Sequence, residues 1–356
     1  MSQTRVEKLK QLLANQQLDA IIIDSPINRR YLSGFTGSAG TLLITLQDSY
    51  LLTDFRYQVQ AVEQAAGFQV VIYPSSPLEE ISRILKQQQA HHVAFEQDIV
   101  SFAQYKRYEA AFHGVHLTGC SGLVEQLREV KDGHEIQIIQ EAAELADRTF
   151  AHILNMIKPG VRELDIALEI EMFMRANGAT SSSFDTIVAS GERSALPHGV
   201  ASERVIGNNE FVKLDFGAYY KGYCSDITRT VFVGKPTEKH YEIYNIVLEA
   251  QLHALEQIKA GMSGLEADAC CRDVIAKYGY GDAFGHSTGH GIGMEIHEAP
   301  RLSRLSDTLL TAGMTVTVEP GIYLPGFGGV RIEDDIVITE SGNQRLTSSP
   351  KELILL

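Results

Sequence analysis

The segment Val-Lys-Leu-Asp-Phe-Gly-Ala-Tyr-Tyr-Lys-Gly-Tyr, from Val212 to Tyr223, decides the fold of this chain because an altered copy of it follows further along. The second copy is Thr-Val-Thr-Val-Glu-Pro-Gly-Ile-Tyr-Leu-Pro-Gly-Phe, from Thr315 to Phe327. Alternating apolar residues followed by glycine-marked turns indicate a β-hairpin in each copy. Aligning the copies places Asp215 over Glu319, Gly217 over Gly321, Tyr219 over Tyr323, Gly222 over Gly326 and Tyr223 over Phe327.

Each hairpin carries a second acid on its return strand, Asp226 in the first and Glu333 in the second. Any one of these acids, taken alone, is most simply explained as part of a solvated strand face. Asp215 and Glu319, however, interrupt apolar runs, so both are expected to point inward and to need compensation. Four carboxylates on facing ribbons would repel one another unless a cation lay among them, and the repeat therefore predicts a metal site.

A glycine-rich segment between the hairpins supplies histidines. Residues 285–300 contain His286, His290 and His297, and glycines on both sides of His290 would let the backbone approach a ligand or a metal closely. Imidazole nitrogen favours Mn, Fe, Co or Zn over Mg and Ca. The segment has neither the Gly-x-Gly-x-x-Gly spacing of a dinucleotide loop nor a His-Glu-x-x-His motif. His198, in a loop at 189–199, suits the rim of an active site.

Length and composition exclude several classes of protein. A chain of 356 residues usually forms two domains. Its formal net charge of −14 argues against nucleic acid as a partner. No segment approaches the roughly 18 consecutive apolar residues of a membrane span, and the N-terminus has the pattern of an amphipathic helix rather than of a secretion signal. Four cysteines without a Cys-x-x-Cys pair suggest a cytoplasmic protein with reduced thiols.

Helical and extended patterns divide the chain near the charged stretch 126–133, which we interpret as the joint between the domains. Residues 1–125 alternate helices and strands, which predicts an α/β domain. In residues 126–356 the order helix, helix, hairpin occurs twice, which predicts an α+β catalytic domain with a pseudo-two-fold internal repeat. The expected helices include 3–17, 56–66, one after Pro77, 135–157, 162–176, 238–260 and 264–278.

The acids and the central histidine resemble a known set. Asp215, Asp226, His290, Glu319 and Glu333, in this order and spacing, are similar to the five ligands of the pita-bread metallopeptidases, which comprise methionine aminopeptidase, aminopeptidase P and prolidase. The motifs that carry the resemblance are Leu-Asp-Phe-Gly, Ser-Asp-Ile-Thr-Arg-Thr, Thr-Gly-His-Gly-Ile-Gly, Val-Glu-Pro-Gly-Ile-Tyr and Gly-Val-Arg-Ile-Glu-Asp-Asp. The segments 31–40 and 52–57 resemble the creatinase-type N-terminal domain of the proline-specific members.

This resemblance implies a role for each residue. It implies two divalent metal ions per subunit, Mn²⁺ first, with Co²⁺ or Zn²⁺ as alternatives. Asp215 would hold one ion, Asp226 and Glu333 would bridge both, and His290 with Glu319 would hold the other. Glu319 would also act as general base, while His198 and His297 would hydrogen-bond the substrate and the developing oxyanion. Arg331 would orient a ligand carboxylate, and Tyr323 and His286 would lie near the metal, with ordinary packing as the alternative.

The resemblance also implies the reaction. The activity that it implies first is that of an Xaa-Pro aminopeptidase, which releases an N-terminal residue preceding proline. The Gly-Phe-Thr-Gly segment at 34–37 favours this activity. The alternative is an Xaa-Pro dipeptidase, or prolidase, in which Arg301 or Arg304 would contact the C-terminal carboxylate. A remote alternative is a non-catalytic peptide-binding protein on the same fold, but all five ligands are intact. Relatives suggest a homodimer whose partners are peptides with proline at the second position.

Overall fold

The computed structural model of the chain describes residues 2–356 and divides into two compact units, Met1–Arg128 and Glu129–Leu356. Each unit contains its own cluster of buried apolar side chains. Within the described residues, no helix combines the length and the apolar composition that crossing a membrane would require. The predicted fold class, an α/β unit followed by a repeated α+β unit, is confirmed.

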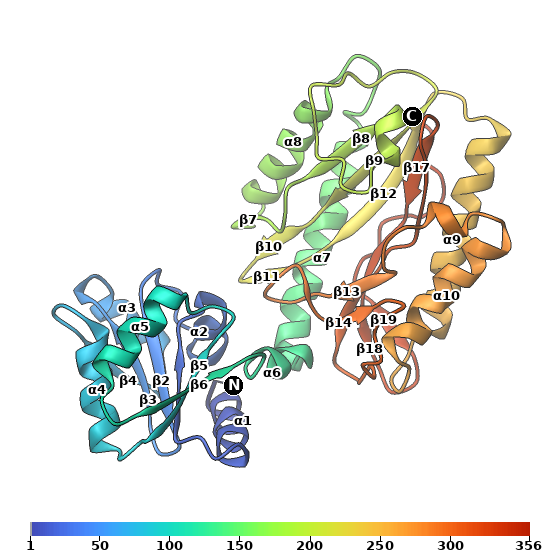
Figure 1. Cartoon of the computed structure of the whole chain (residues 1–356). Helices are drawn as coiled ribbons and strands as arrows, with labels where there is room; N and C mark the ends of the chain where they lie inside the picture. The colour runs from blue at the N-terminus through green and yellow to red at the C-terminus, as the bar shows by residue number, and fades with distance from the viewer. Residues whose placement is uncertain (1) are drawn as a thin grey trace. The chain divides into compact units, whose positions relative to one another are not determined.

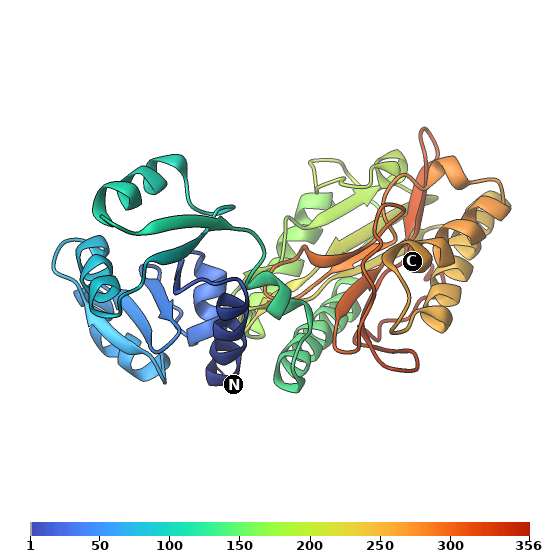
Figure 2. The same ribbon diagram turned by 60° about the horizontal axis from the view of Figure 1, so that its bottom comes forward.

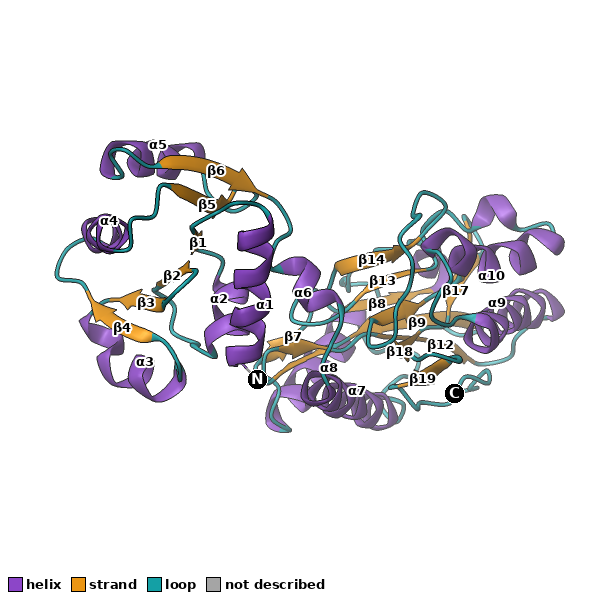
Figure 3. Ribbon diagram, turned by 90° about the horizontal axis from the view of Figure 1, so that it is seen from below, coloured by secondary structure: helices purple, strands orange, loops and turns teal. Residues whose placement is uncertain are grey.

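The N-terminal unit is a six-stranded sheet in the order β4-β3-β2-β1-β5-β6. Because side chains alternate between the faces of a strand, Ala20 and Ile22 of β1 pack against α4 and α5, while α1 and α2 cover the other face (Figures 2 and 3). The elements are α1 (Ser2–Asn15), β1 (Ala20–Ile23), α2 (Pro26–Ser33), β2 (Thr41–Thr45), β3 (Ser49–Thr53), η1 (Phe55–Tyr57), α3 (Gln58–Gln64), β4 (Gln69–Ile72), α4 (Pro77–Gln87), β5 (His92–Glu96), α5 (Phe102–Ala111), β6 (His116–Cys120) and α6 (Glu125–Glu129).

The second unit contains the sequence of two helices and a ribbon twice. Helices α7 and α8 pack on β8, β9 and β12 in one apolar cluster, and α9 and α10 pack on β15 to β18 in another (Figure 1). The elements are α7 (Gly133–Ile153), α8 (Glu163–Ala176), β7 (Ser181–Ser182), β8 (Ile187–Ser190), η2 (Gly191–Ala195), β9 (Glu210–Phe216), β10 (Ala218–Tyr220), β11 (Tyr223–Cys224), β12 (Ile227–Val233), α9 (Glu238–Gln257), α10 (Gly264–Lys277), η3 (Gly281–Ala283), β13 (Gly289–Gly291), β14 (Glu298–Leu302), β15 (Thr315–Val318), β16 (Gly321–Leu324), β17 (Gly328–Arg331), β18 (Asp334–Ile338) and β19 (Asn343–Arg345).

Helix boundaries follow local capping more closely than apolar periodicity. Helix α7 begins after Asp132, whose side chain accepts from the backbone of Glu135 while Glu135 reciprocates in a capping box. It ends at Ile153, short of the expected residue 157, and turns follow it. The helix expected over 56–66 is a 3₁₀ turn, η1, followed by the short α3, because the Asp54 side chain accepts from Arg56 N and holds the first turn tight.

The two ribbons are interrupted where their acids lie, which differs from the simple hairpins expected. In the first, β9 pairs with β12 and Asp215 lies opposite Thr228. In the second, β15 pairs with β18, and Val318 lies opposite Asp334. The chain bends out of the first ladder at Gly217, where a Cβ would lie 1.8 Å from the Ser225 carbonyl oxygen. A shorter hairpin closes each ribbon, β10–β11 in the first and β16–β17 in the second.

Candidate metal centre

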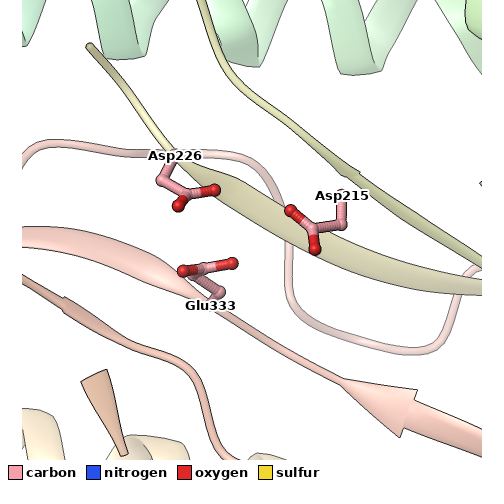
Figure 4. A group of neighbouring side chains, drawn as sticks. All are labelled: Asp215, Asp226 and Glu333. Carbon is pink, nitrogen blue, oxygen red and sulfur yellow. The ribbon is translucent and has the colours of Figure 1, made fainter. Parts of the chain in front are cut away.

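Three carboxylates from the two ribbons converge in the second unit. Asp215 on β9, Asp226 just before β12 and Glu333 just before β18 are buried, and each offers an oxygen within 4.8 Å of the other two. Figure 4 shows the three carboxyl groups turned toward one another. The ribbons meet here because Glu333 N donates to Thr228 O at 3.1 Å.

The electrostatics of this cluster favour a bound cation. Burial raises the pKa of Asp226 and of Glu333 well above the ordinary value, and the neighbouring carboxylates raise both further. Among the described residues, Asp226 Oδ1 and Glu333 Oε1 have no hydrogen-bond partner although both are buried. Buried acceptors normally have hydrogen-bond partners. These oxygens without partners therefore fit a divalent metal ion, which is a hard cation that prefers oxygen ligands.

His290 on β13 points at the same cluster. Its Nε2 lies 3.5 Å from Glu319 Oε1 and 3.8 Å from Asp226 Oδ2. The other ring nitrogen, Nδ1, lies 3.0 Å from the Gly291 carbonyl oxygen and donates to it. This bond fixes the tautomer in which Nε2 carries a lone pair, the form that binds a metal.

The glycines beside His290 are also required by the packing of their own sheet. A Cβ on Gly289 would lie 1.9 Å from the Thr317 carbonyl oxygen, and one on Gly291 would lie 2.2 Å from that of Ala299. Both contacts are to the neighbouring strands β15 and β14. The glycines therefore allow β13 to pack closely within its sheet, and this packing places His290.

Glu319 lies directly after β15 and has a pKa near neutrality. Burial raises the pKa of Glu319 to about 7, and the nearby charges of Arg331 and His198 oppose the rise. Thr317 Oγ1 donates to Glu319 Oε1 at 3.2 Å. A carboxyl group with such a pKa can take up and release a proton at physiological pH.

Arg331 joins several parts of the site through one buried guanidinium. Its Nη2 donates to Asp215 Oδ2, and its Nε donates to Thr228 Oγ1 at 3.0 Å. Its Nη1 donates to Tyr323 Oη at 2.7 Å and to the Pro197 carbonyl oxygen at 3.1 Å. The side chain thus holds the Asp215 carboxylate in one orientation.

Tyr323 and His286 form a pair next to Arg331. His286 Nδ1 lies 2.8 Å from the Ser287 carbonyl oxygen and donates to it, so Nε2 accepts from Tyr323 Oη at 2.8 Å. Burial lowers the pKa of His286 to about 3, and the Arg331 charge adds to this. The ring is neutral at physiological pH and serves to orient the tyrosine.

The remaining predicted residues are exposed, namely His198, His297, Arg301 and Arg304. The rings of His297 and His290 meet edge to face, with centroids 4.4 Å apart. Burial lowers the pKa of His297, and the charges of His290, Arg301 and His198 add to this effect. Arg301 on β14 is exposed and lies directly opposite His290 in the strand pair, so both side chains share one face. The exposed Arg304 makes no such pairing.

Three residues near the cluster are not among the site residues predicted from the sequence. Thr228 Oγ1 donates to Glu333 Oε2 at 2.5 Å, and Asp335 Oδ2 accepts from Asp226 N at 2.8 Å. Lys213 is fully buried, and burial lowers its pKa to about 6. A signal was available for two of them, since Lys213 and Thr228 lie two residues from Asp215 and Asp226 and so share a strand face with an acid.

Comparison with known proteins agrees with this geometry. Residues 137–340 match the profile of metallopeptidase family M24, and residues 5–130 match that of the creatinase/prolidase N-terminal domain. The chain belongs to metallopeptidase family M24. It is therefore a hydrolase that depends on a divalent metal ion.

Relatives of this M24 protein extend over nearly its whole length. The structure of an Xaa-Pro dipeptidase from Bacillus anthracis has a TM-score of 0.98, with 54% identity and full coverage of both chains. An X-Pro aminopeptidase from Thermotoga maritima has a TM-score of 0.92, with 40% identity over 96% of this chain and 98% of that one. An Xaa-Pro dipeptidase of Pyrococcus furiosus is 41% identical over 98% of this chain and 99% of its own.

The charge of the cluster predicts opposite effects of one substitution with and without metal. In metal-free protein at pH 8, Glu333→Gln removes a carboxyl group whose raised pKa means that its ionisation opposes folding. We therefore expect a higher melting temperature than in the parent. With Mn²⁺ at about a hundred times its Kd, the parent should gain about 2.7 kcal/mol, and Glu333→Gln less than half of that. Thermal unfolding with and without Mn²⁺ measures both effects.

The exposed Glu340→Gln is the matched control, because it makes the same chemical change away from the cluster. It should follow the parent in both conditions. Equal stabilisation of Glu333→Gln and the parent by Mn²⁺ would contradict a metal site at these carboxylates.

Proposed function

We propose that this M24 protein is an Xaa-Pro dipeptidase that hydrolyses the bond between an N-terminal residue and a C-terminal proline. The observation that carries the proposal is the convergence of Asp215, Asp226, His290, Glu319 and Glu333, with orphaned oxygens, in a chain 41% and 54% identical to proteins named Xaa-Pro dipeptidase. These names favour the dipeptidase over the aminopeptidase that the sequence had placed first.

We propose that these five residues hold two metal ions. Asp215 would hold the first ion, His290 and Glu319 the second, and Asp226 and Glu333 would bridge between them. A divalent metal bound here supplies Lewis acidity, which activates water and polarises a peptide carbonyl. The oxygen-rich set suits Mn²⁺, and its single imidazole also suits Co²⁺ or Zn²⁺.

The protein's own residues would then move the protons. Glu319 takes a proton from the attacking water as the new C–O bond forms, and it delivers that proton to the proline nitrogen as the C–N bond breaks. His198 and His297 donate hydrogen bonds to the oxygen that becomes negative in the tetrahedral intermediate. Arg331 keeps Asp215 in place, and the Tyr323–His286 pair fixes one side of the guanidinium.

A dipeptide has a free carboxylate next to the bond that breaks, so its recognition requires a cation near the site. Arg301 meets this requirement because it shares a strand face with His290 and is exposed. A charge-assisted hydrogen bond of this kind is worth about 1.5–3 kcal/mol.

A second candidate function is an Xaa-Pro aminopeptidase acting on longer peptides. It is favoured by the Thermotoga maritima aminopeptidase, which is 40% identical. Both functions cleave the same type of bond. They differ in whether the site binds a free carboxylate on the proline.

Assembly and location are part of the proposal. We propose a cytoplasmic homodimer, and support for self-association comes from Phe55, Val59 and Val62, which are 77%, 70% and 67% exposed on the η1–α3 segment. Sedimentation of the full chain measures its mass in solution. A monomeric mass at micromolar concentration would contradict the proposed homodimer.

Substrate length and Arg301 are tested in one experiment. With Mn²⁺, the parent should hydrolyse Xaa-Pro with a higher kcat/KM than Xaa-Pro-Yaa or the amide Xaa-Pro-NH₂. Arg301→Ala should raise KM for Xaa-Pro about 10- to 100-fold and change that for the amide little, because the amide has no carboxylate.

Arg304→Ala is the matched control and should stay within about twofold of the parent on every substrate. A preference for Xaa-Pro-Yaa would establish the aminopeptidase instead. No turnover of any of these substrates with Mn²⁺, Co²⁺ or Zn²⁺ would overturn both functions.

The proton-transfer role of Glu319 predicts a severe loss on removing its basicity. Glu319→Gln should lower kcat at least about a thousandfold, since general acid–base catalysis contributes about 10²–10⁴ and a metal ligand is weakened too. Calorimetry of Mn²⁺ binding separates the two causes. A variant that binds Mn²⁺ and retains more than a tenth of the parent's kcat would refute the assignment.

A further inference from the structure

A buried lysine near the candidate metal centre has no part in the chemistry described so far. Lys213 lies on β9 with an exposed fraction of 0%. Lysine is almost never fully buried unless it is paired. Both hydrogen bonds of its Nζ to the described residues go to main-chain oxygens, at 2.5 Å to Leu196 and 3.2 Å to Pro197. The amine therefore anchors a loop that is distant in the sequence.

The anchored loop is a tight turn that carries His198. Gly199 N donates to the Leu196 carbonyl oxygen at 3.2 Å, which closes a four-residue β-turn with Pro197 in the second position, where proline is favoured. His198 is the third residue of the turn, and its side chain is exposed. Lys213 donates hydrogen bonds to the carbonyl oxygens of the first two residues, Leu196 and Pro197, which directly precede the histidine.

Both turn carbonyls have a second partner besides Lys213. The Leu196 carbonyl already accepts from Gly199 N, and the Pro197 carbonyl already accepts from Arg331 Nη1 at 3.1 Å. Neither oxygen would be left without a partner if the amine were absent. Burial of a lysine costs desolvation free energy that an apolar side chain of the same length would avoid. The amine therefore contributes position more than stability.

The position it fixes is that of the turn relative to the metal ligands. Lys213 precedes Asp215 by two residues on the same strand, so both side chains leave one face of β9. Arg331, which binds the Pro197 carbonyl, also binds Asp215. The turn is thereby attached at two points to the strand and the guanidinium that set the Asp215 carboxylate.

We propose that Lys213 is a positioning residue that holds His198 at the distance from the metal ligands at which it contacts substrate. This rests on the proposed function, because His198 is assigned its contact there. Lys213 touches neither substrate nor metal and acts through the turn.

A double-mutant cycle tests the action through His198. Lys213→Met keeps an unbranched chain of similar length and removes the donors. It should lower kcat/KM for Xaa-Pro about 10- to 100-fold in the parent. In a His198→Ala background the same change should cost less than about twofold, because the residue being positioned is gone. Equal losses in both backgrounds would overturn the proposal.

Hydrogen exchange of the metal-free protein gives a readout that does not depend on activity. In Lys213→Met, the amides of Gly199 and Val200 should exchange at least about tenfold faster than in the parent, while the melting temperature stays the same or rises. Unchanged exchange in these amides would show that the lysine does not hold the turn. If the parent turns over no Xaa-Pro substrate, the proposed function fails, and exchange still decides whether Lys213 holds the turn.

Lys351→Met is the matched control for removing a buried amine. Lys351 Nζ donates to Asp334 Oδ2 at 2.5 Å and to Gln251 Oε1 at 2.9 Å, away from the turn. This control should lower the melting temperature, because it breaks a buried ion pair, and leave exchange at Gly199 and Val200 unchanged. Should Lys213→Met not fold, Lys213→Gln replaces it, since its shorter amide cannot reach both carbonyls and should give the same two effects at smaller size.

Discussion

Repulsion among buried carboxylates is the constraint on which the second unit depends. Asp215, Asp226 and Glu333 come together from different ribbons as buried side chains. Burial and the neighbouring carboxylates make ionisation of Asp226 and Glu333 unfavourable without a cation. The surrounding side chains reduce this repulsion by donating hydrogen bonds to the carboxylates. Arg331 binds Asp215, and Thr228 binds Glu333 while accepting from Arg331. Oxygens without such donors remain directed at the space where a metal fits.

The repeat provides the frame for this arrangement, but the two copies are not used alike. Each ribbon leaves its ladder near the acid and closes in a shorter hairpin. In the first copy Asp215 is held by an arginine, which suits a residue that only binds metal. In the second copy Glu319 receives one hydrogen bond from Thr317 and has a pKa near neutrality, raised by burial, which suits a residue that moves protons.

The sequence predicted the fold class and the family because both depend on local signals: apolar periodicity, the hairpin repeat and the spacing of short motifs. It did not predict contacts between segments that are far apart. Nothing near Lys213 in the sequence reveals that its partners are the carbonyls at 196 and 197. Nor did it predict that strand packing requires the glycines around His290. The close contacts of these glycines depend on strand register, which is a property of the whole sheet.

The shared guanidinium of Arg331 has a consequence for how this enzyme can evolve. One side chain supports the Asp215 carboxylate, the tyrosine next to His286 and the turn before His198. A substitution that shifts any of these parts would disturb the others, so variation within the chemical centre is tightly restricted. Leu305, in the segment after β14, lies outside this set of hydrogen bonds and is 96% exposed. New substrate preferences can therefore arise in peripheral loops of this kind, while the reaction itself stays fixed.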